Sequence, residues 1–273
     1  MPDNSIKLLV IDIDGTLLNK KGEVAPADID AITVASRKGI QIALSTGRVV
    51  QASLHVIEKL GLDGYHVFFD GALASNPHTG HEVFVEPIAP ELIEQMIAYN
   101  KAHNTVTDFY SVSDFFVEEE TWASEIRRKF FHLKPIVTDY GSLHKRERII
   151  KATLVVRTEE EKASAREFVK YFEDVLHFSW TTTPAYPGID FINILNPKVS
   201  KGRALEALSN FLDIPLSSIA AIGNGSNDIS LLQKAGYAVA MGNSPDDLVA
   251  VADYVTLDVE QCGVAHVINT VLL

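Results

Sequence analysis

Two aspartates, Asp12 and Asp14, stand two residues apart at the end of the apolar run in LLVIDIDGTLLN. Alternate residues of a strand point to the same face, so both carboxylates can reach one crevice. Close carboxylates repel each other unless a cation lies between them or they share a proton. One acid could therefore act as a nucleophile and the other as a general acid and base. An acidic loop after a core strand is the alternative, but the surrounding residues favour catalysis.

A second polar group, Ser45, Thr46 and Gly47, follows the apolar run IQIAL. We expect these residues to open the next helix, where free N–H groups and hydroxyls suit a phosphate oxygen. An ordinary Ser/Thr helix cap fits the same residues equally well.

Lys201 and Gly202 begin an amphipathic segment in NPKVSKGRALEAL, with Ser200 as its expected cap. The helix dipole slightly disfavours a lysine at this position. A functional role, in which Lys201 leans over a phosphate and steadies the two aspartates, is therefore favoured over a solvated lysine.

The stretch IGNGSNDIS brings Asn224, Asn227 and Asp228 into a glycine turn between an apolar run and a helix-like segment. Amide oxygens can be ligands of Mg²⁺, but they bring no charge. A helix-capping turn with an early acid is the alternative.

The elements around these motifs alternate between short apolar runs and helical spacing, which predicts an α/β fold with a doubly wound, Rossmann-like parallel sheet. Open parallel sheets bind ligands at the carboxyl ends of their strands, where the first, second and fourth of these motifs fall. Expected strands are 8–11, 40–44, 66–69, 219–222, 237–240 and 254–257. Expected helices are 27–38, 49–60, 201–212, 228–234, 245–252 and 263–271.

The middle of the chain has longer, more alternating strand candidates, which predict an inserted α+β domain with a partly antiparallel sheet. Expected strands there are 105–110, 114–119, 149–157, 178–183 and 188–195, and expected helices are 90–103, 121–131 and 159–175. The predicted division is a core domain of residues 1–83 and 190–273 with an inserted domain of residues 84–189.

Bulk composition excludes several classes of protein. The 273 residues carry a net charge of −12, so nucleic acid is not an expected partner. No run approaches the ~20 apolar residues of a membrane span. The acidic N-terminus is unlike a signal peptide, and Cys262 is the one cysteine. We expect a cytoplasmic protein, monomeric or homodimeric, that does not bind membranes.

Taken in order, DxDGT, STGR, a distant lysine before a helix and GNxxND resemble the haloacid dehalogenase-like superfamily of phosphatases. The inserted domain and the later segments MGNSPDDLVAVADYVT and GVAHVI are similar to the Cof-type sugar-phosphate phosphatases, whose α/β cap enters between the second and third motifs. The resemblance implies hydrolysis of small phosphorylated metabolites such as sugar phosphates.

The resemblance also implies roles. Asp12 would attack the phosphoryl group and form an aspartyl phosphate. Asp14 would protonate the leaving alcohol and then activate water. Lys201 would stabilise the developing charge. Implied phosphate-binding residues are Ser45, Thr46, Gly47, Lys201 and Asn227.

Mg²⁺ is the implied cofactor. Its implied ligands are the Asp12 carboxylate, the Asp14 backbone oxygen and residue 224, with Asp228 anchoring the metal's water shell. The family usually has an aspartate where this chain has Asn224, so we expect weaker Mg²⁺ binding. Two further departures, Asp70 and Cys262, lie outside the four motifs and receive little weight.

Two alternatives remain open. Loss of the aspartate at position 224 could leave a catalytically weak phosphometabolite-binding protein. A phosphomutase-type phosphotransferase would reuse the same aspartyl phosphate, although a large α/β cap argues against it. Several cap residues are candidates for substrate contact, with packing or solvated roles favoured for each: Tyr110, Trp122, Arg127, Arg128, Lys151, Trp180 and Tyr186.

Overall fold

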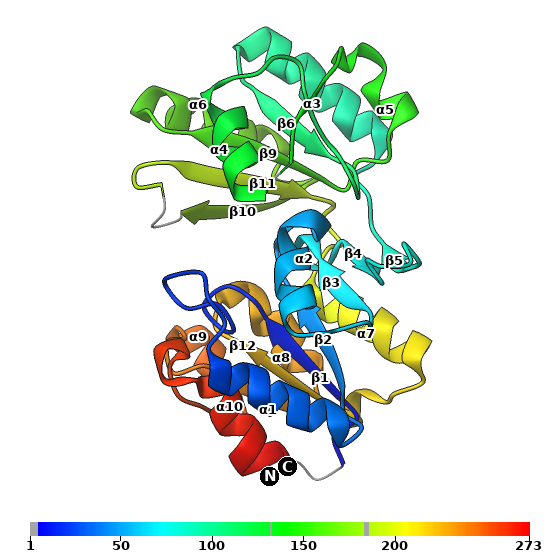
Figure 1. Cartoon of the computed structure of the whole chain (residues 1–273). Helices are drawn as coiled ribbons and strands as arrows, with labels where there is room; N and C mark the ends of the chain where they lie inside the picture. Colours follow the sequence, from blue (N-terminus) through cyan, green and yellow to red (C-terminus); the bar gives the residue numbers. More distant parts are fainter. Residues whose placement is uncertain (1–4, 132, 183–185) are drawn as a thin grey trace. The chain divides into compact units, whose positions relative to one another are not determined.

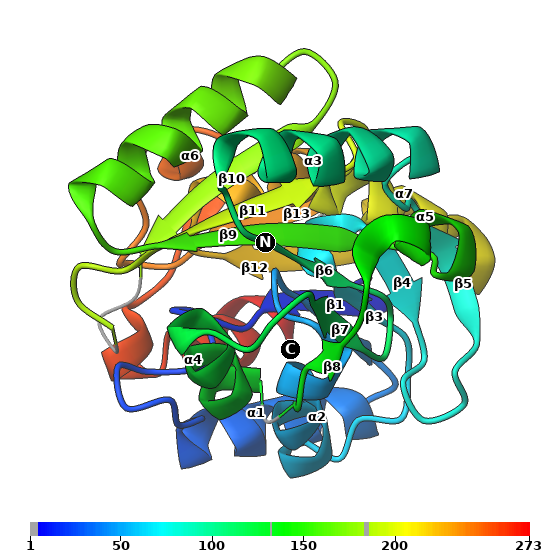
Figure 2. The same cartoon turned by 90° about the horizontal axis from the view of Figure 1, so that it is seen from above.

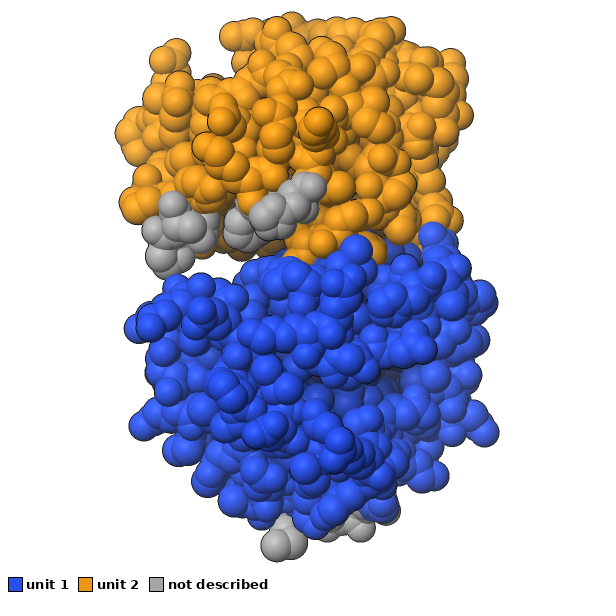
Figure 3. All heavy atoms as spheres, in the orientation of Figure 1, with its two compact units in different colours: residues 1–48, 53–84, 200–273 blue, residues 49–52, 85–199 orange. Residues whose placement is uncertain are grey.

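The computed structural model describes residues 5–131, 133–182 and 186–273. Figures 1 and 2 show its elements from two directions. Within the described ranges, contacts divide the chain into two compact units, coloured in Figure 3. Unit 1 comprises residues 1–48, 53–84 and 200–273, and unit 2 comprises residues 49–52 and 85–199.

Unit 1 is built on a mainly parallel sheet, with the strand order β14-β13-β12-β1-β2-β3-β4-β5 among the described residues. Strands from β14 to β3 are parallel, and β4 runs antiparallel to β3. The bounds are β1 Leu8–Asp12, β2 Gln41–Ser45, β3 His66–Phe68, β4 Leu73–Ser75, β5 Glu82–Val85, β12 Ile219–Gly223, β13 Tyr237–Ala240 and β14 Tyr254–Val255. The predicted parallel α/β core is confirmed.

Both faces of this sheet are covered, which explains why the central strand β1 is apolar from Leu8 to Ile11. Leu8 and Val10 of β1 pack with Leu205 and Leu208, and the intervening Leu9 points to the other face and is also buried. The helices of this part of the chain are α1 Pro26–Arg37, α2 Val50–Lys59, α7 Lys201–Leu212, α8 Ile229–Lys234, α9 Asp246–Val249 and α10 Gly263–Val267. Helix α1 contacts α10, and α7 contacts α8.

Unit 2 has a separate mixed sheet, ordered β10-β11-β9-β6-β7-β8 in the part of the chain that is described. Neighbouring strands of this sheet are antiparallel except for β7 with β8. The strands are β6 Thr107–Tyr110, β7 Phe115–Val117, β8 Ile136–Val137, β9 Lys151–Val156, β10 His177–Thr182 and β11 Asp190–Leu195. The helices are α3 Pro90–His103, α4 Trp122–Phe131, α5 Leu143–Arg146 and α6 Glu159–Phe172.

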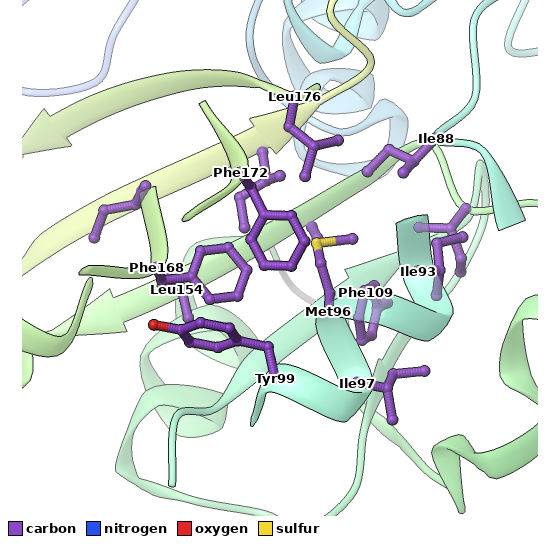
Figure 4. Packing of buried hydrophobic residues seen from close by; sticks show 14 of the residues in the cluster. Ile88, Ile93, Met96, Ile97, Tyr99, Phe109, Leu154, Phe168, Phe172 and Leu176 are labelled. Carbon is purple, nitrogen blue, oxygen red and sulfur yellow. The ribbon is translucent and has the colours of Figure 1, made fainter. Parts of the chain in front are cut away.

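Helices α3 and α6 cover one face of the second sheet (Figure 2). Between them and the sheet lies an aromatic-rich core in which Met96, Phe109, Leu154, Phe168 and Phe172 are buried (Figure 4). Side chains alternate between the two faces along β6 and β9. The opposite face of the sheet therefore carries Asp108, Tyr110, Lys151 and Thr153.

Several sequence-based boundaries differ from the structure. Strand β11 pairs with β9 and β10, so residues 190–199 belong to unit 2 rather than to the core domain expected from residue 190. Helix α2 begins at Val50, so Ser45, Thr46 and Gly47 do not open it. The sequence analysis also missed β4, β5, β8 and α5, which are too short to show a periodic pattern. No described helix has both the length and the apolar character needed to cross a membrane.

Candidate active site

The carboxyl ends of β1, β2 and β12 bring distant parts of the sequence together. Asp12, the last residue of β1, is in register with Ser45, the last residue of β2. On the other side of β1, Ile11 pairs with Ile222 of β12, so Gly223 and the turn after it lie at the same edge. Parallel pairing thus assembles a polar site from three loops.

Lys201 links these loops. Its Nζ donates to Asp12 Oδ1 at 2.7 Å, to Asp228 Oδ1 at 2.6 Å and to the Ser45 carbonyl oxygen at 3.3 Å. All three ionisable side chains are buried. Burial alone would lower the pKa of Lys201, but the charges of the two carboxylates together raise it above its usual value. With both acids ionised, two carboxylates against one lysine give this buried trio a net negative charge, so the site favours a further cation or hydrogen-bond donor.

Burial and, next in size, the neighbouring carboxylate of Asp228 raise the pKa of Asp12 to about 7, although Lys201 opposes them. The loss of hydration disfavours the charged form of the acid. Positive charge or hydrogen-bond donors near the free oxygen of Asp12 would therefore favour its carboxylate form.

Asp228 shapes the turn after β12. Its Oδ2 accepts the backbone N–H groups of Asn224 and Gly225, both at 3.0 Å. A Cβ at Gly223 would lie 2.6 Å from the Asp228 side chain, so only glycine leaves room for the carboxylate to fold back. Asp228 thus fixes the turn through one oxygen and Lys201 through the other.

Three oxygens converge beside Asp12. Asn224 Oδ1 accepts a hydrogen bond from Thr16 Oγ1 at 3.1 Å. The same amide atom lies 2.8 Å from the Asp14 carbonyl oxygen and 3.2 Å from Asp12 Oδ2, facing acceptors. Oxygens that share an octahedral Mg²⁺ at ~2.1 Å lie about 3 Å apart, so this donor set fits the ion. The described residues hold no cluster of three His, Cys, Asp or Glu suited to a metal, because two of these three oxygens come from an amide and a backbone carbonyl.

Asp14 points its carboxylate elsewhere. Arg48 Nη2 donates to Asp14 Oδ1 at 2.6 Å, and Arg48 Nε donates to Asp14 Oδ2 at 2.8 Å. The Asp14 side chain is 56% exposed, so substrate and water can reach it. A bidentate guanidinium–carboxylate pair also fixes the orientation of the acid. Arg48 is the last residue of the STGR motif, and the local sequence does not predict its pairing with Asp14.

The segment of Ser45, Thr46 and Gly47 supplies a buried hydroxyl group but does not form the N-terminus of a helix. Ser45 Oγ is buried and makes no hydrogen bond with any described group. Thr46 N–H donates to the Val67 carbonyl at 2.9 Å, and Thr46 Oγ1 accepts the Arg48 N–H. The expected help from Thr46 N–H to a phosphate therefore loses its support, because the sheet uses that N–H.

Asn227 and Asp70 lie at the rim of the site. Asn227 Nδ2 donates to Asp70 Oδ1 at 3.1 Å. A Cβ on Gly47 would lie 2.7 Å from Asp70 Oδ1, so the carboxylate leans over the second motif. Asp70 also raises the pKa of Lys201 through its charge. Nothing in the local sequence DGALASN predicts that Asp70 lies at this site.

Asn243, in the segment MGNS, also contacts a loop of the site. Asn243 Nδ2 donates to the Gly15 carbonyl at 2.9 Å, and Asn243 Oδ1 accepts the Val259 N–H at 3.3 Å. Asn243 therefore ties the loop after β1 to the chain after β14.

Some cap residues that were candidates for substrate contact are used inside unit 2. Arg127 is 2% exposed and its Nε lies 2.7 Å from Asp108 Oδ2. Arg127 also donates to the buried Tyr110 hydroxyl. The indole of Trp122 stacks under Arg157, and Trp180 Nε1 donates to Asp190 Oδ2 at 2.9 Å. Packing accounts for Arg127 and Tyr110, as the sequence analysis favoured.

Comparisons with known proteins place this geometry in context. A family model described as haloacid dehalogenase-like hydrolase matches residues 9–268. Phosphatase YwpJ of Bacillus subtilis (strain 168) is 28% identical, over 98% of this chain and 100% of its own. From the same organism, 5-amino-6-(5-phospho-D-ribitylamino)uracil phosphatase YwtE is 26% identical, over 98% of each chain. The crystal structure of TM0651 from Thermotoga maritima shares the fold, with a TM-score of 0.85, 24% identity and 97% coverage of both chains.

Proposed function

Because this chain belongs to the haloacid dehalogenase-like hydrolases, of the Cof type with an α/β cap, we propose that it hydrolyses phosphomonoesters through an aspartyl phosphate on Asp12. The observation that carries the proposal is the buried contact of Lys201 with both Asp12 and Asp228. Phosphoryl transfer requires positioning and charge neutralisation, which this arrangement supports.

In the first step, an Asp12 oxygen bonds to phosphorus while the bond from phosphorus to the leaving oxygen breaks. Asp14 gives its proton to that leaving oxygen. In the second step, Asp14 takes a proton from water, the water oxygen bonds to phosphorus, and the bond from phosphorus to Asp12 breaks. The ion pair between Arg48 and Asp14 stabilises the carboxylate form of Asp14, which the second step requires. The two side chains must separate while Asp14 carries the proton.

The other residues of the site would neutralise negative charge and orient the phosphoryl group. Lys201 would balance negative charge on Asp12 and on the transferring group, and the Ser45 hydroxyl would donate to a phosphoryl oxygen. Mg²⁺ would be held by Asp12 Oδ2, the Asp14 carbonyl and Asn224 Oδ1, and when bound it supplies positive charge to the phosphate oxygens. Asp228 would act indirectly, since one of its oxygens binds Lys201 and the other binds the backbone of the turn after β12.

For the substrate we propose a small phosphorylated metabolite, with sugar phosphates and the phosphoribitylamino-uracil named for YwtE as the first two to test. A binding protein without turnover is the second candidate, because Asn224 removes a negative charge from the proposed metal site. Nothing in the site favours the phosphomutase alternative.

The test is phosphate release from an aryl phosphate and from a panel of phosphorylated sugars and nucleotide precursors, with Mg²⁺ present. We expect turnover by wild type, none above background by Asp12→Asn, and wild-type rates from the matched surface variant Asp30→Asn. Rapid quenching followed by peptide mass spectrometry should find the phosphoryl group on the peptide that contains Asp12. Equal rates for Asp12→Asn and wild type would remove the nucleophile assignment. Tight ligand binding with no turnover would favour the binding protein.

A further inference from the structure

We propose that Asn224 works as a rotating amide, which neutralises the acidic site by donating hydrogen bonds when no cation is present and turns its oxygen to the cation when one binds. The inference rests on the proposed function, because it concerns the same metal site. It predicts a behaviour that an aspartate at this position could not have.

One orientation of the amide suits a cation. Oδ1 then lies 2.8 Å from the Asp14 carbonyl oxygen and 3.2 Å from Asp12 Oδ2. Three oxygens this close repel one another unless positive charge lies among them. The Thr16 hydroxyl can donate to Oδ1 in this orientation, at 3.1 Å.

The opposite orientation suits the site without a cation. Half a turn about the side-chain bond puts Nδ2 in the same place, where it can donate to Asp14 O at 2.8 Å, to Thr16 Oγ1 at 3.1 Å and to Asp12 Oδ2 at 3.2 Å. The Thr16 hydroxyl serves both states, since it can donate in one and accept in the other. An amide N–H thus takes the place of the ion beside Asp12.

The charges explain why this exchange matters. Asp12 and Asp228 are buried with Lys201 as their shared cation. An aspartate at position 224 would add a third carboxylate, and a cation-free site would then hold three acids against one lysine. Uncompensated buried charge is strongly destabilising. Asn224 avoids this penalty, because it presents a donor when the ion leaves.

The loop after β1 leaves space for the amide. Gly15 has a φ of +81°, and a Cβ on it would lie 2.3 Å from Asn224 Nδ2. Any side chain at position 15 would therefore press on the amide. Asn224 is also only part-buried, so its side chain is not enclosed on all sides.

Thermal unfolding with EDTA or Mg²⁺ alone tests the energetic half of the inference. We expect the Tm of wild type to differ little between the two conditions. Asn224→Asp should have a lower Tm than wild type in EDTA, a larger rise with Mg²⁺, and half-saturation at a roughly tenfold lower Mg²⁺ concentration, since affinity follows ligand charge. Asn210→Asp is the matched control. It makes the same change at an exposed position near the C-terminal end of α7, so its Mg²⁺ response should match wild type.

Side-chain amide NMR tests the rotation itself. One NH₂ pair of the wild-type spectrum should be missing from Asn224→Asp, and that pair should shift when Mg²⁺ is added. If it stays still while the backbone signals of Asp14 and Gly15 move, the amide keeps one orientation and the inference fails. Equal EDTA stability of wild type and Asn224→Asp would also overturn it. Neither measurement uses turnover, so loss of the proposed function and loss of this inference give different results.

Discussion

Asp70 is an acid in a place that should hold an anionic substrate. Its carboxylate lies close to Gly47 and accepts a hydrogen bond from Asn227, and the family resemblance implies that both of these residues bind phosphate. Like charges at short range weaken binding even where solvent screens them. Asp70 therefore works against phosphate affinity while it helps to keep Lys201 protonated.

Asp70→Asn should lower KM for a phosphomonoester by roughly three- to tenfold, because it removes one negative charge and keeps an acceptor for Asn227. Steady-state kinetics at low and high salt would measure this, with a smaller gain at high salt. Asp63→Asn removes an exposed acid at the opposite end of β3 and serves as the control. An unchanged KM in Asp70→Asn would mean that substrate phosphate binds away from Asp70.

Asp28 is a buried acid outside the site. Its Oδ1 accepts the Ala265 N–H at 2.7 Å, whereas its Oδ2 is buried without a hydrogen bond from any described group. Burial raises the pKa of Asp28 to about 6, despite the opposing effect of the Ala265 hydrogen bond. The folded protein therefore binds this proton more tightly than the unfolded chain does.

The raised pKa of Asp28 in the folded protein makes the stability of the protein depend on pH. The stabilising contribution of protonated Asp28 is complete below about pH 3.8 and is lost as pH rises through about 6. Asp28→Asn should thus raise Tm at pH 8 relative to wild type, and the gain should vanish near pH 3.8. Asp30→Asn, exposed on the same helix, should show no such pattern in the same melting series. A gain that is constant across pH would assign the effect to something other than this proton.

At the scale of elements, helices α7 and α8 pack closely at the start of α7, where Lys201 is the first residue. A Cβ on Gly202 would lie 2.3 Å from the Ser230 carbonyl oxygen, and Gly202 N–H donates to Ser230 Oγ at 3.2 Å. Ser200 caps α7 through the Arg203 N–H. Packing therefore explains Gly202, since a larger residue beside Lys201 would push α7 away from α8.

Gly202→Ala should cost about 1–3 kcal/mol of unfolding free energy through overpacking. It should also lower kcat, because the displaced helix start moves Lys201 from its two carboxylates. Denaturant unfolding and steady-state kinetics would measure the two effects. Asn210→Ala, exposed near the end of the same helix, should leave both close to wild type. Native stability and full activity in Gly202→Ala would show that the helix can move without loss.

The sequence predicted long elements better than short ones. The bounds of α3 and α7 agree with the expected ranges, because fourteen and twelve residues of helical spacing carry a clear signal. Strand β8 has two residues and no pattern of its own, and it forms by pairing with β7. The proposed catalytic acids and Lys201 were predicted from their place after strands and before a helix.

Contacts across the chain were not predictable in the same way. The Arg48 pair with Asp14, the lean of Asp70 over Gly47 and the place of Asn224 beside Asp12 depend on loop backbones. Asp70, for example, adopts a left-handed φ of 55° that no neighbouring residue signals. Such features are set by tertiary hydrogen bonds, including that from Asp70 N–H to the Thr46 carbonyl at 3.0 Å.

At the scale of the whole molecule, each unit has its own hydrophobic core. Figure 4 shows Phe168 within the core of unit 2, where it is fully buried, and it packs edge-on to Tyr99. The core of unit 1 contains other residues, from β1, α7 and α8 among others. Chains with separate cores often unfold in more than one transition.

Phe168→Ala should cost unit 2 about 3–5 kcal/mol of unfolding free energy, as expected for an emptied aromatic site. Calorimetry should show one transition at lower temperature and a second that keeps its wild-type position and its response to Mg²⁺. Tyr171→Ala, on the same helix but 68% exposed, should shift neither by more than ~1 kcal/mol. A single transition that moves as a whole would mean that the two units unfold cooperatively.

The order of synthesis follows from the way unit 1 is assembled. Asp12 and Lys201 are 189 residues apart, and the continuous segment 85–199 of unit 2 is made between them. At ~5–20 residues per second, roughly 10–40 s of translation separate the two residues. A ribosome thus releases the first strand of the core long before the lysine that neutralises its aspartate exists, while the segment of unit 2 is already complete. The proposed active site is among the last things that the growing chain can build.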